Sequence, residues 1–156
     1  NDGSWSGDID SDSGVNCTVA KYGCARAFDG SGDYVNAGND DSLKITSDMT
    51  VSTWFRLNEP YNSSSTEDFA LFNREDGWTV LIYSPDAGRL RFGTYGGNVQ
   101  TAKDSWDADT WYHVVITFKD TNNATIYVDG VEDMYNSDYS TSDTIASNTN
   151  VLEIGT

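Results

Sequence analysis

The stretch Phe28-Asp29-Gly30-Ser31-Gly32-Asp33-Tyr34-Val35 decides the fold class of this sequence. It places a turn of glycine, aspartate and serine between two short segments rich in strand-forming residues. Further along, Trp111-Tyr112-His113-Val114-Val115-Ile116-Thr117-Phe118 alternates so that one face of a strand is hydrophobic. Tyr127-Val128-Asp129-Gly130 ends a strand in Asp-Gly, a strong hairpin signal. These stretches predict antiparallel strands joined by tight turns.

The rest of the chain repeats this pattern. Short alternating runs are separated by turn residues, and no sustained run has apolar residues at helical spacing. This predicts an all-β sandwich with strands at residues 25–28, 34–37, 50–57, 69–74, 79–83, 90–94, 99–103, 112–119, 124–128, 131–135 and 152–154.

Length and composition indicate a single folded domain. A chain of 156 residues is long enough for one sizeable core and too short for two ordinary domains. Aromatic residues make up 13% of the chain, which supplies core volume and excludes a disordered protein. We expect an extended arm or loop at residues 1–15 and one β-domain at residues 16–156.

The net charge of −16 restricts the partners. Such a chain repels nucleic acid phosphates and anionic lipid, so we expect neither nucleic acid binding nor membrane insertion. No stretch resembles a signal peptide or a membrane span, and the first residue is Asn1 rather than Met. We interpret the chain as the mature form of a secreted, extracellular protein.

Two further features fit export. Cys17 and Cys24 lie seven positions apart and could close a small loop as a disulfide. Three N-glycosylation sequons begin at Asn16, Asn62 and Asn123. Each lies where we predict a loop or a strand end, where a glycan is tolerated.

The motifs together resemble the laminin-G-like, concanavalin-A-like lectin and glucanase superfamily, especially its microbial secreted variant. The resemblance covers nearly the whole chain, and the pieces occur in the order found in that family. They are Lys21-Tyr22-Gly23, Phe28 to Val35, Ser42-Leu43, Thr50 to Phe55, Trp111 to Phe118, Tyr127 to Gly130 and Leu152 to Gly155. The resemblance implies a two-sheet antiparallel jelly-roll sandwich. It leaves function open, because this fold hosts lectins, hydrolases and structural modules.

The ends of the chain depart from the family pattern. Family domains begin with an apolar strand and end with a strand such as Gly-x-Ile-Asp-Glu-Val, and neither is found here. Either the chain is part of a longer protein, or another copy completes the sandwich by strand addition and forms a head-to-tail polymer. The donor arm would be residues 5–15, with apolar anchors Trp5, Ile9 and Val15.

The sequence disfavours an enzyme. The single histidine, His113, lies within an apolar strand. Glycoside hydrolysis needs two carboxylates that face one sugar, and glucanases of this fold carry Glu-x-Asp-x-Glu on one strand. The acidic pairs here, such as Glu67-Asp68 and Glu132-Asp133, are adjacent and point to opposite faces of a strand. We therefore expect no catalytic residue.

Two kinds of binding site are predicted. Calcium would use Asp29, Gly30 and Asp33, because the turn brings two carboxylates together with carbonyls between them. Related domains often bind calcium near this turn. A carbohydrate would stack on aromatic residues in or beside loops, and the candidates are Trp78, Tyr95 and Trp106.

Two hypotheses for function follow. The leading one is a non-catalytic structural or adhesive module, a subunit of a secreted assembly or fibre joined by strand complementation. The alternative is a calcium-dependent carbohydrate-binding module of a larger secreted protein.

Overall fold

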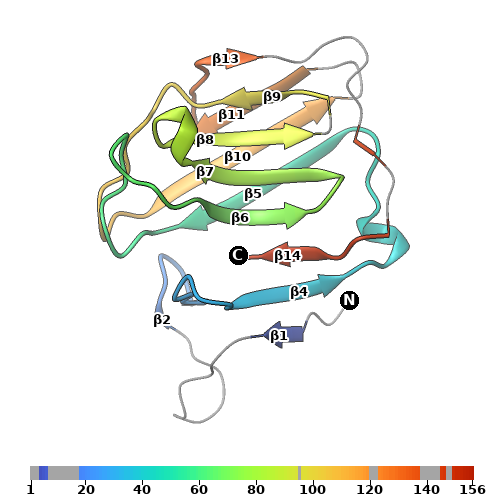
Figure 1. Ribbon diagram of the computed structural model, residues 1–156, viewed down its shortest axis with the longest axis horizontal. Helices are drawn as coiled ribbons and strands as arrows, with labels where there is room; N and C mark the ends of the chain where they lie inside the picture. Colours follow the sequence, from blue (N-terminus) through green and yellow to red (C-terminus); the bar gives the residue numbers. More distant parts are fainter. Residues whose placement is uncertain (1–3, 7–17, 95, 120–122, 138–144, 147–148) are drawn as a thin grey trace.

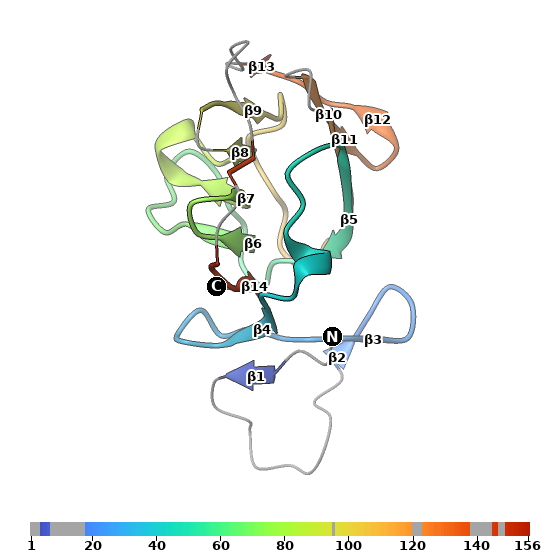
Figure 2. The same cartoon turned by 90° about the vertical axis from the view of Figure 1, so that its right-hand side faces the viewer.

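Two antiparallel β-sheets pack face to face in the computed structural model (Figures 1 and 2). The structure describes residues 4–6, 18–94, 96–119, 123–137, 145–146 and 149–156. This architecture confirms the predicted all-β sandwich.

The larger sheet has eight strands, and each pairs antiparallel with its neighbours. The last strand of the chain is inserted between two strands that precede it by more than 75 residues, so the sheet joins distant segments (Figure 1). In spatial order the strands are β1 (Ser4–Ser6), β4 (Tyr34–Gly38), β14 (Leu152–Ile154), β6 (Phe69–Arg74), β7 (Trp78–Tyr83), β8 (Arg89–Thr94), β9 (Asn98–Gln100) and β13 (Asn136–Ser137).

The smaller sheet has four strands, in the order β12 (Val131–Glu132), β11 (Asn123–Val128), β10 (Tyr112–Lys119) and β5 (Met49–Phe55). β5 is the last strand at one end of this sheet and pairs with β10 on its other side. The remaining elements are the hairpin of β2 (Thr18–Val19) and β3 (Cys24–Ala25) and the 3₁₀ helices η1 (Asp41–Leu43) and η2 (Ser84–Asp86).

The Asp-Gly turn between β11 and β12 forms the predicted hairpin. Val128 pairs with Val131, so the loop has two residues. Asp129 and Gly130 have φ angles of 51° and 83°. A positive φ at both central residues is the geometry that matches the twist of the flanking strands and that Asp-Gly favours.

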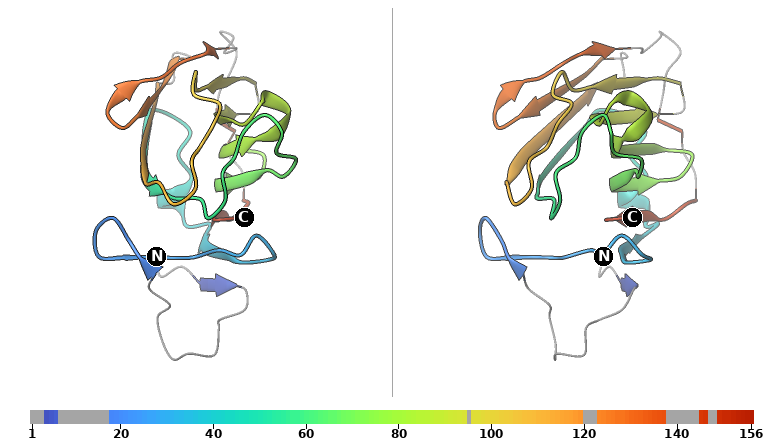
Figure 3. Two further views of the ribbon diagram at one scale, coloured as in Figure 1. Left: turned by 90° about the vertical axis from the view of Figure 1, so that its left-hand side faces the viewer. Right: turned by 60° about the vertical axis from the view of Figure 1, so that its left-hand side comes forward.

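The core lies between the two sheets (Figure 3). β7 and β10 alternate between buried and partly exposed residues, as a strand with one face on the core must. Phe92 of β8 and Phe118 of β10 bring the sheets together, with ring centroids 5.8 Å apart. Because aromatic pairs of this kind fill large volumes, a chain with modest hydrophobic content still closes its core.

Several strand boundaries differ from the predicted ones. β9 ends at Gln100 rather than residue 103, and β12 ends at Glu132 rather than residue 135. β1 is a short strand within the segment that we expected to be an extended arm or loop, and β13 is a short strand that we did not predict. β1 pairs with β4 of the same chain, and Trp5 lies opposite Val35. Backbone pairing along a sheet edge does not need a hydrophobic pattern in the added strand, which is why the sequence does not signal these strands.

Over the part of the chain that the structure describes, no helix is both long enough and apolar enough to span a bilayer.

Candidate ligand-binding site

The outer face of the larger sheet carries a cluster of polar residues on β8 and β9. Leu90, Phe92 and Val99 point into the core and are completely buried. Their neighbours along each strand therefore point outward. The strand register places Arg91 opposite Gln100 and Gly93 opposite Asn98.

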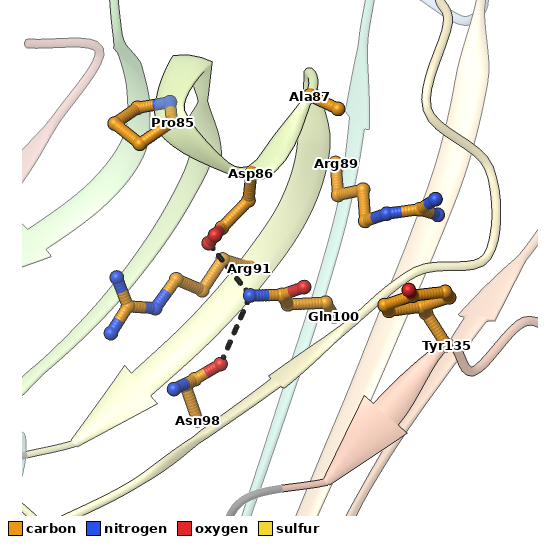
Figure 4. Close-up of a pocket in the computed structure, with 8 residues that line it drawn as sticks. All are labelled: Pro85, Asp86, Ala87, Arg89, Arg91, Asn98, Gln100 and Tyr135. Atoms are coloured by element: carbon orange, nitrogen blue, oxygen red, sulfur yellow. Dashed lines mark hydrogen bonds between the residues drawn. The ribbon is translucent and has the colours of Figure 1, made fainter. Parts of the chain in front are cut away.

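These side chains line a cleft of about 450 Å³, within the range of small-ligand sites. The lining consists of Pro85, Asp86, Ala87, Arg89, Arg91, Asn98, Gln100 and Tyr135 (Figure 4). The turn that follows η2 closes one side of the cleft. Its backbone is left-handed at Ala87 and Gly88, with φ angles of 59° and 84°. Asp86, the last residue of η2, comes directly before this turn.

Gln100 is at the centre of a hydrogen-bond network in the cleft (Figure 4). Its Nε2 donates to Asp86 Oδ2 at 2.6 Å and to Asn98 Oδ1 at 3.3 Å. Gln100 is only 7% exposed, so these bonds fix the orientation of its amide. Donors and acceptors are thus presented in fixed positions along one wall.

Arg89 holds one end of the cleft in place. Its Nη1 donates to the carbonyls of Thr101, at 3.0 Å, and Ala102, and its Nη2 lies 3.5 Å from Asp104 Oδ2. The guanidinium lies 3.9 Å from the ring centroid of Tyr135. This stacking supports the Tyr135 ring, which is 61% exposed and offers a flat apolar surface at the mouth of the cleft.

Arg91 has a different environment from Arg89. Among the described residues it takes part in no ion pair, and its Nε is buried without a hydrogen-bond acceptor. The guanidinium lies 5.1 Å from the ring centroid of Tyr83. A Cβ at Gly93 would lie 3.6 Å from Arg91 Nε, an ordinary contact distance, so the guanidinium lies directly beside Gly93 and a larger side chain there would meet it.

The predicted calcium turn is largely satisfied by its own hydrogen bonds. Asp29 Oδ1 accepts from Ser31 N at 2.7 Å, and Asp33 Oδ2 accepts from Asp29 N at 3.2 Å. Asp33 is 7% exposed, and its buried Oδ1 has no hydrogen-bond partner in the part of the chain that the structure describes. Gly30 has a φ of 77°, which a glycine adopts readily. Among the residues described, no three histidine, cysteine or acidic side chains form a metal-binding group.

Two of the predicted carbohydrate-contact rings lie in the core, which corrects the sequence-based expectation. Trp78 and Trp106 are 5% and 1% exposed, so neither is available to stack on a ligand. The Trp106 ring packs edge-on against Phe55 and Tyr112, and its Nε1 donates to Gly88 O at 2.8 Å. Trp78 is the first residue of β7 and points inward, whereas Trp106 lies between β9 and β10 and its backbone pairs with that of Tyr61. Tyr95 lies outside the described residues.

The other predicted sites are partly described. Cys24 is disulfide-bonded, and the only other cysteine of the sequence, Cys17, lies outside the described residues. Asn62 and Asn123 are both exposed. Asn16 and the arm residues Ile9 and Val15 also fall outside the described part, as does the Trp5 side chain.

His113 lies on the outer face of the smaller sheet, away from the cleft. Its Nε2 lies 3.0 Å from Ser52 Oγ, and its ring stacks on Trp54 with centroids 4.8 Å apart. The imidazole is thus held by a cross-strand hydrogen bond and a stacking contact.

Our sequence analysis missed the residues of the cleft. The signal was present at 89–92, where arginine alternates with leucine and phenylalanine and predicts one polar and one buried face. Nothing local pairs this segment with Tyr135, which reaches the cleft through a backbone hydrogen bond from its N to Gln100 O at 2.8 Å.

Solved structures with this fold include two toxin domains. The binding domain of Paraclostridial Mosquitocidal Protein 1 matches with a TM-score of 0.54 at 16% identity, over 80% of this chain and 37% of that chain. The receptor binding domain of botulinum neurotoxin C/D mosaic serotype matches with a TM-score of 0.51 at 15% identity, over 80% and 32% respectively. The chain thus spans about a third of each, and at these identities the likeness concerns the fold alone.

Comparison with curated proteins found no significant match. The sequence model of the family described as the concanavalin A-like lectin/glucanases superfamily, Laminin_G_3, matches residues 29–156. This range covers the jelly roll from the Gly/Asp turn through β14. The chain therefore belongs to the concanavalin A-like lectin/glucanase superfamily, as its motifs predicted.

Proposed function

We propose that this chain is a non-catalytic carbohydrate-binding module of a secreted protein, with its ligand in the cleft on β8 and β9. The observation that carries the proposal is a row of fixed donors and acceptors beside an exposed aromatic ring. Sugar hydroxyls both donate and accept, so they match the Asp86 carboxylate and the amides of Asn98 and Gln100. The apolar face of a sugar ring matches Tyr135.

The chemistry of the cleft also favours binding over hydrolysis. Asp86 is the only carboxylate among the described residues that line it. Glycoside hydrolysis uses two carboxyl groups across the scissile bond. A cleft with one carboxylate, committed to Gln100, supports recognition of a glycan without its cleavage.

A glycan array followed by calorimetry tests the proposal. We expect Tyr135→Ala to weaken binding of the best glycan at least tenfold, because the stacking surface is lost, and Gln100→Ala to do the same through the network. Tyr22→Ala is the matched control, since Tyr22 is 76% exposed and contacts Trp54 on the other sheet. No binding to any glycan, or equal loss in the control, would overturn the proposal.

Calcium dependence is a further part of the proposal. Asp33 Oδ1 is a buried carboxylate oxygen with no partner among the described residues. Carboxylate oxygens are the ligands that calcium uses, and Gly30 would add a carbonyl. We expect a chelator to lower the midpoint of thermal unfolding and Asp33→Asn to abolish that response. An unchanged midpoint in the chelator would contradict calcium binding here.

A second candidate function is self-assembly by strand addition, favoured by the position of β5 at the end of its sheet. Such a strand presents backbone groups to another chain. Because β1 pairs with β4 of its own chain, donation of the arm to another copy would require an exchange of that pairing.

Proline substitutions separate assembly from folding. Neighbouring residues of β5 direct their N–H groups to opposite sides of the strand, one toward β10 and the other toward the outer edge of the sheet. Of the two variants Ser52→Pro and Thr53→Pro, one therefore removes an N–H from the outer edge and the other removes an N–H that faces β10. We expect light scattering to show concentration-dependent polymers of the wild type and monomers of the folded outer-edge variant. A wild type that is monomeric at every concentration rules out assembly.

A further inference from the structure

We propose that the glycan bound in this cleft carries a carboxylate, and that Arg91 binds it. The inference rests on the proposed carbohydrate function and names the ligand class, a hexuronic acid residue in an otherwise neutral glycan. It starts from a contrast between two arginines that share one face of β8, two residues apart.

Arg89 is fully engaged by the protein. It is bonded to two backbone carbonyls, paired with Asp104 and stacked on Tyr135. Its charge is therefore paired with Asp104, and both Nη1 hydrogens are already used. Arg89 is a positioning residue that keeps the aromatic surface in place.

Arg91 is positioned without an ion pair to a described residue. It contacts the Tyr83 ring and lies beside Gly93, while no described carboxylate pairs with it. A guanidinium that forms no ion pair with a described residue, and whose buried Nε–H has no acceptor among them, can take one from a ligand. Its remaining donors match a carboxylate, which binds guanidinium in a planar fork.

The order of groups across the cleft gives the ligand a direction. Figure 4 shows the Arg91 guanidinium and the Tyr135 ring on opposite sides of Gln100. The acid group would lie at Arg91 and Asn98, a sugar ring would stack on Tyr135, and Asp86 would accept from hydroxyls between them. A second carboxylate near Asp86 would be repelled.

The charge of the whole protein makes this recognition local. At a net charge of −16, the chain attracts no anion at long range. Affinity for an acidic sugar must come from contact with Arg91 itself. Densely charged polyanions should therefore bind worse than a glycan with one isolated uronic acid.

Calorimetry with two matched oligosaccharides tests the inference. The first contains one glucuronic acid residue, and the second is the same molecule after reduction of the carboxyl group to an alcohol. We expect the wild type to bind the acid at least tenfold more tightly. Arg91→Gln should bind both equally, at the level of the reduced sugar, and Arg91→Lys should recover only part of the difference, because lysine lacks the fork.

The control is Lys119→Gln, which removes one exposed positive charge from the smaller sheet and should leave the preference intact. Equal binding of both sugars by the wild type overturns the carboxylate inference but leaves the proposed function standing. Binding of neither sugar, together with a silent glycan array, overturns the proposed function itself. If the preference for the acidic sugar survives in Arg91→Gln, Arg91 is not responsible for it. If a terminal sialic acid binds more tightly than the uronic acid, the hexuronic acid is the wrong ligand class.

Discussion

The two faces of β8 and β9 differ completely although their residues alternate along the same strands. On the inner face Leu90, Phe92 and Val99 have no exposed surface. On the outer face, Arg91 and Gln100 line the cleft. Core and site are therefore one residue apart, and the packing that fixes one face also fixes the backbone that carries the other. A site on such strands is preorganised by the core beneath it.

The largest difference between the faces should appear in two neighbouring residues. Phe92→Ala removes a fully buried ring that contacts Phe118, and we expect it to lower the free energy of unfolding by about 3–5 kcal/mol. Arg91→Gln should lower it by less than about 1 kcal/mol, since the guanidinium forms no ion pair with a described residue and the variant loses only its contact with the Tyr83 ring. Urea unfolding of both variants measures this, and equal destabilisation would mean that Arg91 belongs to the fold rather than to the site.

Thr101 sharpens the comparison, because it is a polar residue with no exposed surface. Its hydroxyl accepts from Leu90 N at 3.0 Å and donates to Lys103 O at 2.6 Å. Thr101→Val would leave both groups without a partner and should cost about 1–3 kcal/mol in unfolding free energy. Thr101→Ser keeps the hydroxyl and serves as the control, so a similar loss in both variants would assign the effect to packing instead.

Strands with long alternating patterns could be predicted from the sequence. β10 has the expected bounds, because eight residues of alternation leave one register that buries its apolar face. The Asp129-Gly130 turn likewise followed from its own residues. β1 and β13 could not be predicted, since their pairing depends on the edge of a neighbouring strand and not on their own side chains.

The site was less predictable than the fold for a physical reason. Trp78 and Trp106 are aromatic rings of the kind that could stack on a sugar, but Trp78 lies on the inward face of β7 and Trp106 packs against Phe55 and Tyr112, so both are buried. Tyr135 becomes the exposed ring because Arg89, from another part of the chain, supports it. Exposure of an aromatic ring is a tertiary property, so motifs near turns do not determine it.

A titratable ring in the hydrophobic core gives a pH test of the comparison between the core and the outer face. Tyr61 is 3% exposed, and its hydroxyl donates to Glu67 O. Burial, followed by the charge of Asp68, raises the pKa of Tyr61 above its usual value of 10.0. The folded state thus holds this proton more tightly than the unfolded state. The resulting stability is complete below about pH 10 and is lost as the pH rises through the folded pKa.

Tyr61→Phe should therefore flatten the alkaline loss of stability. At neutral pH the variant loses one hydrogen bond and should be about 1 kcal/mol less stable than the wild type. Thermal unfolding between pH 7 and pH 12 measures both effects. If the wild type and the variant lose stability in parallel above pH 10, titratable groups other than Tyr61 govern the alkaline loss of stability.

The smallest expected effect lies at Gly93, on the outer face beneath Arg91. A Cβ there would lie 3.4 Å from Thr79 Oγ1 and 3.6 Å from Arg91 Nε, which are ordinary contacts, and the residue does not have a positive φ. Gly93→Ala should therefore leave the unfolding free energy unchanged or raise it by up to about 0.5 kcal/mol, because alanine loses less chain entropy. The branched side chain of Gly93→Val would instead push the guanidinium out of its position. We expect the alanine variant to keep the preference for the acidic sugar and the valine variant to lose it. Thermal unfolding should show a cooperative transition for both variants, which checks that each is folded. Loss of the preference in neither variant would mean that Arg91 does not need this space, and that the geometry of the outer face is looser than that of the core behind it.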